Sequence, residues 1–203
     1  KEKRKNPAND LLSAIANAEI NGEKLSDEFL DGSWLLIIFA GNDTTRNTMS
    51  GGIKLLHENQ KQKEMLIDNL ELLPNFINET VRCVSPVIHM RRTSLEETEI
   101  NGQKIGPYEK IALWYGAANR DPDVFEDPDK FNILRDNADK HLAFGIGRHT
   151  CIGKPVALMQ LQEFYSQFLT RFQDFEMNGD WKVAPNNFVH AIQEMPIKFS
   201  PSK

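Results

Sequence analysis

The residue pattern predicts one exceptionally long helix in the first third of the chain. It runs from Ser26 to about His57. Ser26 is a suitable N-cap, and the acidic residues Asp27 and Glu28 favour the positive end of the helix dipole. Such a helix would measure roughly 45–50 Å. Residues 41–45 include several poor helix formers, so we expect an interruption near its middle.

Further helices are predicted at about residues 60–69 and 72–83, the second ending before Ser85-Pro86. A glycine-rich loop at residues 144–153 then precedes another helix. The apolar stripe expected on that helix consists of Val156, Leu158, Leu161, Phe164, Phe168 and Phe172.

Strands are expected between these helices and at the end of the chain. Residues 92–100 and 103–114 flank Asn101-Gly102, which favours a two-residue type I′ hairpin. A final hairpin is predicted around residues 185–187. The turn-rich segment 119–140 has little periodicity, and long irregular segments are usually functional or disordered. The expected fold class is mainly α with small β-sheets (α+β).

Composition excludes several classes of protein. The net charge of −5 over 203 residues argues against nucleic-acid binding. The longest apolar run, residues 34–40, is far shorter than the roughly 20 residues that span a bilayer, so no transmembrane segment is expected. Two cysteines without a signal peptide indicate reduced thiols and a cytoplasmic protein.

The candidate chemistry centres on FGIGRHTCIG, residues 144–153. Glycines allow the backbone to pass close to a flat ligand. Cys151 precedes a helix start, whose N–H groups favour a thiolate. A thiolate in an apolar loop can ligate iron and favour O–O cleavage. The alternative is an inert cysteine in a glycine-rich turn, which is the commoner case for an isolated cysteine.

The full pattern resembles the haem-binding loop of cytochromes P450. It comprises Phe144, Gly145, Gly147, His149, Cys151 and Gly153. The resemblance implies haem b (heme b) with iron bound axially by Cys151. It also implies that Phe144 packs near the haem–thiolate face and that His149 bonds a haem propionate.

Two helical motifs support this resemblance. AGNDTT, residues 40–45, resembles the P450 oxygen-activation motif and implies proton delivery by Asp43 and Thr44, with Gly41 leaving room for oxygen. The alternative is a weak spot tolerated in a buried helix. Glu79 and Arg82 resemble the family's Glu-x-x-Arg structural pair, although the same spacing also suits a simple surface ion pair.

A third residue, usually Arg, completes that pair in the family. Lys130 stands at the matching position here and lacks the planar fork of Arg. Either Lys130 substitutes imperfectly, or Arg135 takes the role.

PVIHMRRT, residues 86–93, resembles the segment that carries a propionate-binding Arg, with Arg92 the better match and Arg91 its neighbour. The alternative is two exposed strand arginines. The resemblance also implies a set of apolar substrate contacts, namely Phe39, Ala40, Val87, Ile88, Phe188 and Val189.

The resemblance covers essentially the whole chain. It implies that residues 1–203 are the C-terminal portion of a single P450 domain whose N-terminal half is absent. Residues 114–121 resemble soluble bacterial members that hydroxylate sterol side chains, terpenoids or alkyl chains.

The implied activity is a monooxygenase that inserts one oxygen atom of O₂ into a C–H bond of an apolar substrate. Its electrons would come from a ferredoxin with an NAD(P)H reductase. Arg148 and Lys154 would attract that acidic partner, unless they are ordinary surface charge.

Two other interpretations stay open: a peroxide-using P450 relative, and a haem-binding fragment without turnover. We expect this stretch alone to bind haem poorly and to be inactive.

Overall fold

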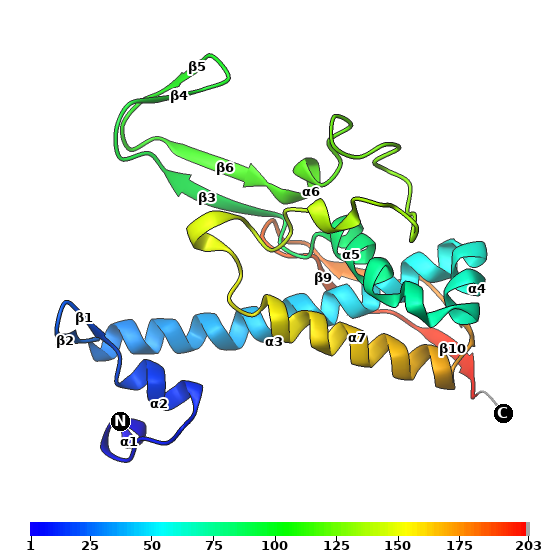
Figure 1. Ribbon diagram of the computed structural model, residues 1–203, viewed down its shortest axis with the longest axis horizontal. Coiled ribbons are helices and arrows are strands. Elements are labelled where there is room, and N and C mark those ends of the chain that lie inside the picture. Colours follow the sequence, from blue (N-terminus) through cyan, green and yellow to red (C-terminus); the bar gives the residue numbers. More distant parts are fainter. Residues whose placement is uncertain (202–203) are drawn as a thin grey trace. The chain divides into compact units, whose positions relative to one another are not determined.

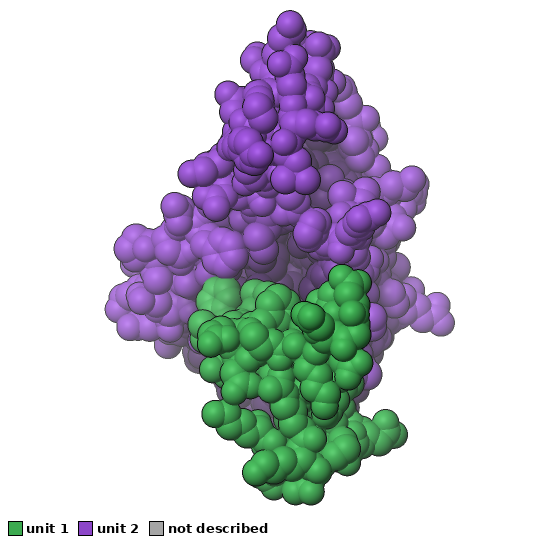
Figure 2. Space-filling model, turned by 90° about the vertical axis from the view of Figure 1, so that its left-hand side faces the viewer, with its two compact units in different colours: residues 1–42 green, residues 43–203 purple. Residues whose placement is uncertain are grey.

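The computed structural model describes residues 1–201. The chain divides into two compact units, residues 1–42 and residues 43–203, which Figure 2 colours separately. The helix α3 (Asp27–Glu58) belongs to both, because the boundary falls within it.

The first unit is small and held by polar contacts. It contains α1 (Glu2–Lys5), α2 (Leu11–Ala16), the paired strands β1 (Glu19–Ile20) and β2 (Glu23–Lys24), and the start of α3. Asp10 caps α2, because its carboxylate accepts a hydrogen bond from the Ser13 N–H at 2.7 Å. Arg4 bonds the Ala16 carbonyl at 2.9 Å and the Asp27 carboxylate at 2.7 Å. The charged opening segment is therefore partly folded.

The long helix is confirmed, but its expected interruption is absent. The Ser26 hydroxyl accepts a hydrogen bond from the Phe29 N–H at 3.2 Å, and α3 runs unbroken to Glu58. Residues 41–45 stay helical because intrinsic propensity is a weak preference that the context of a long helix overrides.

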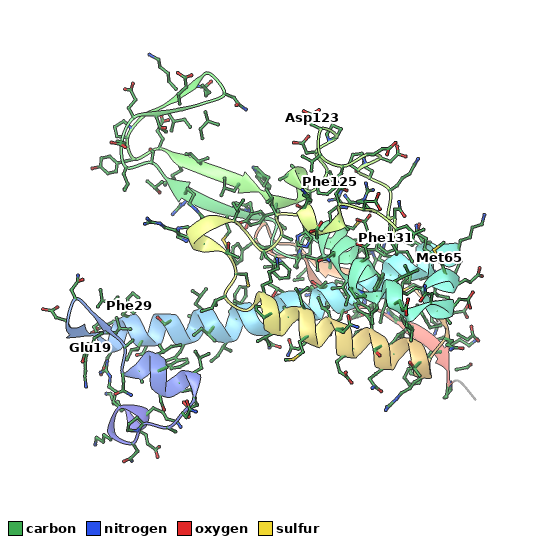
Figure 3. The ribbon with its side chains drawn as sticks, viewed as in Figure 1. Glu19, Phe29, Met65, Asp123, Phe125 and Phe131 are labelled. Atoms are coloured by element: carbon green, nitrogen blue, oxygen red, sulfur yellow. The ribbon has the colours of Figure 1, made fainter. Side chains whose placement is uncertain are left out.

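The second unit has a helical core. The later half of α3 packs with α4 (Gln60–Asp68), the 3₁₀ turn η1 (Leu70–Leu72), α5 (Leu73–Val84) and α7 (Lys154–Arg171). Phe76 lies at its centre, with its ring 4.7 Å from that of Tyr165 and 6.2 Å from that of Phe131. Phe125 and Phe131, labelled in Figure 3, are also buried.

The predicted apolar stripe of α7 is only partly correct. Leu161 is buried, but Val156 is 53% exposed, and the fully buried line continues through Tyr165 and Leu169. These buried residues recur every four positions along one face of the helix. Tyrosine was missed because its hydroxyl makes it look like a surface residue, whereas here the hydroxyl donates to the Thr48 carbonyl of α3 at 2.9 Å.

The strands form small antiparallel pairs rather than one sheet. The predicted turn at Asn101-Gly102 is present, with positive φ at both residues. The two long strands expected around it are each split, as Figure 1 shows. The four resulting strands pair as β3 (His89–Thr93) with β6 (Lys110–Trp114), and β4 (Thr98–Ile100) with β5 (Gln103–Ile105).

The end of the chain forms the predicted hairpin and one further pair. Strands β8 (Lys182–Ala184) and β9 (Ala191–Glu194) make the hairpin, and β10 (Ile197–Ser200) returns to β7 (Asp174–Met177). Between α6 (Tyr115–Ala118) and the cysteine loop, the only helical turn before residue 147 is the 3₁₀ turn η2 (Ala138–Lys140). No helix within residues 1–201 is long and apolar enough to cross a bilayer.

Candidate functional site

The cysteine loop closes on itself just before α7 begins. The Cys151 N–H donates to the Phe144 carbonyl at 2.8 Å, and the Thr150 N–H donates to the Gly147 carbonyl at 3.1 Å. The 3₁₀ turn η3 (Gly147–His149) lies within the loop, and α7 starts at Lys154. Cys151 therefore directly precedes a helix N-terminus, and its residue surface is exposed.

Three glycines give this loop its shape. Gly145 and Gly147 have φ of +70° and +68°, in the left-handed region that favours glycine. A Cβ at Gly145 would also lie 3.1 Å from the His149 carbonyl oxygen, and one at Gly153 would lie 3.8 Å from the Cys151 sulfur. At Gly153 the loop thus places no Cβ beside the sulfur, which leaves room for a flat ligand.

Phe144, the aromatic residue of the loop, has Lys154 and His141 as neighbours. The Lys154 ammonium lies 5.4 Å from the centre of the Phe144 ring, and the centre of the His141 ring lies 5.6 Å from the same point. His141 is buried, and burial followed by the charge of Lys154 lowers its pKa to about 4. A neutral His141 is the expected state at pH 7, and its Nδ1 accepts from the Ala143 N–H at 3.3 Å.

Glu79 forms a buried cluster with two arginines, Arg82 and Arg135. Arg82 donates from Nε and Nη2 to the two carboxylate oxygens at 2.7 and 2.8 Å, and the Arg135 Nε lies 3.2 Å from both oxygens. Remaining guanidinium N–H groups donate to backbone carbonyls of the irregular segment. This Glu79 cluster therefore ties α5 to residues 126–130.

Arg135 and not Lys130 completes the cluster, which corrects the placement of Lys130. The Lys130 ammonium bonds the exposed Asp127 carboxylate at 2.7 Å, and its side chain is 73% exposed. Only its backbone carbonyl takes part, accepting from both arginines. A single Lys head group offers no fork for shared carboxylate oxygens and carbonyls, whereas the planar guanidinium does.

Asn119 links this cluster to the cysteine loop, a role that sequence reasoning missed. Its carbonyl accepts from Arg82 at 2.8 Å, its amide donates to the Ser85 hydroxyl at 2.8 Å, and its Oδ1 accepts from the Leu142 N–H at 2.6 Å. Asn119 is fully buried. Asn119 lies in the turn-rich segment just before Asp121-Pro122. That position indicated a polar structural contact but did not indicate which residues it would bond.

The two cysteines have different environments. The Cys83 sulfur contacts Arg82 at 3.3 Å and Glu79 at 3.8 Å, and burial followed by the Glu79 charge raises the pKa of this thiol to about 12. Cys83 is therefore a protonated thiol at pH 7, which leaves Cys151 as the exposed cysteine of the pair.

The predicted propionate contacts are Arg92 and His149. Arg92 on β3 is half-buried, and its Nη1 donates to the Arg91 carbonyl at 3.0 Å. Neither Arg92 nor the exposed His149 pairs with a carboxylate within residues 1–201. The Arg92 guanidinium and the His149 imidazole are thus available to bind an anionic ligand.

Asp43 and Thr44 are neighbours on α3. The Asp43 carboxylate accepts from Arg46 at 2.5 Å, and its side chain is 21% exposed. The Thr48 hydroxyl donates back to the Thr44 carbonyl at 2.9 Å, the i−4 bond by which threonine loosens a helical ladder. Asp43 and Thr44 therefore place an acid and an alcohol at consecutive positions of the helix.

The predicted substrate contacts fall in two groups. Val87 and Val189 form a β-bridge, and the Ile88 N–H donates to the Phe188 carbonyl at 2.8 Å, so these four residues lie together. Phe39 and Ala40 belong to the first unit, where Phe39 is 41% exposed. Their place beside the other four stays a prediction.

Comparison with known proteins places the chain in a family. The family model described as Cytochrome P450 matches residues 1–199. Linalool 8-monooxygenase of Pseudomonas putida is 38% identical over 199 residues, covering 98% of this chain and 49% of the relative. Steroid C26-monooxygenase of Mycolicibacterium smegmatis is 38% identical over 203 residues, covering 99% and 50%. The chain belongs to the cytochrome P450 family.

Solved structures of cytochromes P450 are similar to this chain in fold. A Mycobacterium marinum cytochrome P450 in complex with pseudoionone has a TM-score of 0.91 at 37% identity, covering 98% of this chain and 48% of that structure. A Novosphingobium aromaticivorans cytochrome P450 has a TM-score of 0.88 at 38% identity, covering 94% and 48%. The chain thus spans about half the length of the relatives it matches.

Members of this family bind haem, with the iron held by a cysteine thiolate. The loop fits that group, because Cys151 is exposed before a helix, Gly153 places no Cβ beside its sulfur, and Gly145 and Gly147 have positive φ. Within residues 1–201 no cluster of three or more His, Cys, Asp or Glu residues suits an all-protein metal site, whereas a haem iron needs one protein thiolate.

Proposed function

We propose that the protein containing this chain is a haem-thiolate monooxygenase that inserts one oxygen atom of O₂ into a C–H bond of an apolar substrate. The observation that carries the proposal is the exposed Cys151 in a glycine loop before α7. The buried Glu79 cluster is joined to the segment before that loop through Asn119. When bound, haem supplies the oxygen chemistry.

The residues of this chain would hold the cofactor and move protons. Cys151 would supply the thiolate ligand of the iron, Phe144 would pack beside that sulfur, and Arg92 and His149 would bind the haem carboxylates. Asp43 and Thr44 hold and transfer a proton, because an acid adjoining an alcohol can relay one across a short distance. Arg46 keeps the Asp43 carboxylate oriented.

The substrate class is proposed to be terpenoid, sterol or alkyl. Relatives at 38% identity are named for linalool and for a steroid. The four residues brought together by the Val87–Val189 bridge are aliphatic or aromatic, which suits such molecules.

Electrons are proposed to come from a ferredoxin and its NAD(P)H reductase in the cytoplasm. Arg148 lies in the loop and Lys154 at the start of α7, where cations would attract an acidic partner. Two free cysteines are consistent with a reducing compartment.

Replacing Cys151 with Ser tests the proposal. Because Ser offers no thiolate, we expect the Cys151→Ser protein to lose the red-shifted Soret band of the ferrous–CO complex. Cys83→Ser is the matched control and should keep that band, since Cys83 is a buried protonated thiol. An unchanged spectrum in Cys151→Ser would falsify the assignment.

Asp43 and Thr44 distinguish the dioxygen route from a peroxide-using relative. We expect Asp43→Asn to reduce NAD(P)H-driven product formation by on the order of 10²-fold, while peroxide-driven product is largely kept. Equal loss by both routes, or by neither, would contradict a proton relay at these residues.

We also propose that residues 1–203 alone bind haem poorly and do not turn over. Leu35, Leu36 and Ile38 on α3 are each more than 60% exposed, so apolar surface of the helix is uncovered in the described chain. A ferrous–CO spectrum of residues 1–203 beside the longer protein decides this: a full thiolate-type band from the short chain would contradict it.

A further inference from the structure

A cavity in the unit of residues 43–203 involves none of the cysteine-loop residues. Its volume is about 440 Å³, and it lies between α3, the end of α5, α6 and the β8–β9 hairpin. Apolar side chains form much of its wall: Leu55, Val84, Trp181, Val183 and Ile192. Cavities of this size commonly hold small organic ligands.

The polar part of the wall consists of three basic residues together with Ser85 and Cys83. Lys54, Arg120 and His190 line the cavity, and no Asp or Glu is among its lining residues. The Lys54 ammonium lies 4.5 Å from the centre of the Trp181 ring and is bonded to Glu58, which lies outside the lining. The lining therefore combines basic and apolar side chains and contains no acidic one.

Arg120 has a fixed position at this wall. Its Nη1 donates to the Gly116 carbonyl at 3.2 Å, and its Nη2 donates to the Cys83 carbonyl at 2.9 Å. Its carboxylate contact, Asp129 at 3.4 Å, is 86% exposed, so water screens that ion pair. The guanidinium is thus held in place without being neutralised by a buried acid.

His190 supplies an uncommitted hydrogen-bonding group. Its backbone N–H donates to the Pro86 carbonyl at 2.9 Å, whereas its imidazole has no hydrogen-bond partner within residues 1–201. Partial desolvation, followed by the positive charge of Arg120, lowers the pKa of His190.

We propose that this cavity is a binding site for a small amphipathic carboxylate, separate from the cysteine loop. The carboxylate would bind between Arg120 and His190, with Lys54 adding positive charge. The hydrophobic body would lie on Trp181 and the aliphatic side chains. The inference does not depend on the proposed monooxygenase activity.

The test uses the haem-loaded protein with its haem pocket blocked by a saturating azole. Isothermal titration with 1-naphthoate should then show one binding site per chain. The neutral analogue 1-naphthamide should bind on the order of tenfold more weakly, because it cannot form the charge-assisted bonds.

Arg120→Gln should weaken 1-naphthoate binding by a similar factor, whereas Arg171→Gln, outside the cavity, should leave it unchanged. The amide comparison needs no variant, so it decides the question even if Arg120→Gln folds poorly. No heat of binding for naphthoate, or equal affinity for acid and amide, would overturn the proposal. The azole spectrum reports the haem site separately, so this failure is distinguishable from failure of the proposed function.

Discussion

At the scale of single residues, the Glu79 cluster shows how chemistry chooses between candidates. The buried carboxylate accepts from two guanidinium groups, and each guanidinium also bonds backbone carbonyls. A buried charge is tolerable only when such partners surround it. The resemblance to the family left Lys130 and Arg135 open as the third member, and the donor geometry of Arg distinguishes them.

Removing Arg135 should therefore cost far more stability than removing Lys130. We expect Arg135→Ala to lower the free energy of unfolding by about 3 kcal/mol or more, because a buried charge loses a partner and carbonyls lose donors. Lys130→Ala should change it by less than about 0.5 kcal/mol, since its ammonium bonds an exposed acid. Urea unfolding measures both, and equal effects would refute the assignment.

At the scale of elements, α3 and α7 approach closely where a glycine leaves room for an aromatic hydroxyl. The Tyr165 hydroxyl lies near the Thr48 and Met49 carbonyls of α3, at 2.9 and 3.0 Å. A Cβ built at Gly52 would lie only 2.0 Å from that hydroxyl oxygen. The contact thus depends on a residue without a side chain, although glycine itself disfavours a helix.

Gly52→Ala should be destabilising despite the better helix propensity of alanine. We expect a loss of about 1–3 kcal/mol in the free energy of unfolding, because the added methyl forces Tyr165 or α3 to shift. Gly32→Ala in the same helix meets nothing within 4 Å and should stabilise by up to about 1 kcal/mol. Thermal unfolding of both variants makes the comparison, and a stabilised Gly52→Ala would contradict the close contact.

At the scale of the whole molecule, the buried His141 links stability to pH. Its folded pKa of about 4 is below the unfolded value of 6.5, so the unfolded chain binds more protons between these values. Its contribution to stability is therefore present above pH 6.5 and is lost as pH falls towards 4, by up to about 3 kcal/mol.

His141→Gln should flatten this part of the stability profile. Denaturant unfolding at pH 7, 6 and 5 would show a smaller fall for the variant than for the parent, whatever their absolute stabilities. Parallel profiles would mean that His141 is not buried as a neutral ring. Carboxylates shared by both proteins cancel in this comparison.

Local sequence patterns correctly predicted the long helix from Ser26, the hairpin turn at Asn101-Gly102 and the helix after Cys151. These depend on local spacing, capping and turn chemistry, which neighbouring residues settle. Four features became visible only in the folded chain. They are the continuous helix through the middle of α3, the contact of Arg135 with Glu79, the hydrogen bonds of Asn119 and the burial of Tyr165. Each of these depends on contacts between residues far apart in the chain, whose strength outweighs local propensity and which no local pattern records.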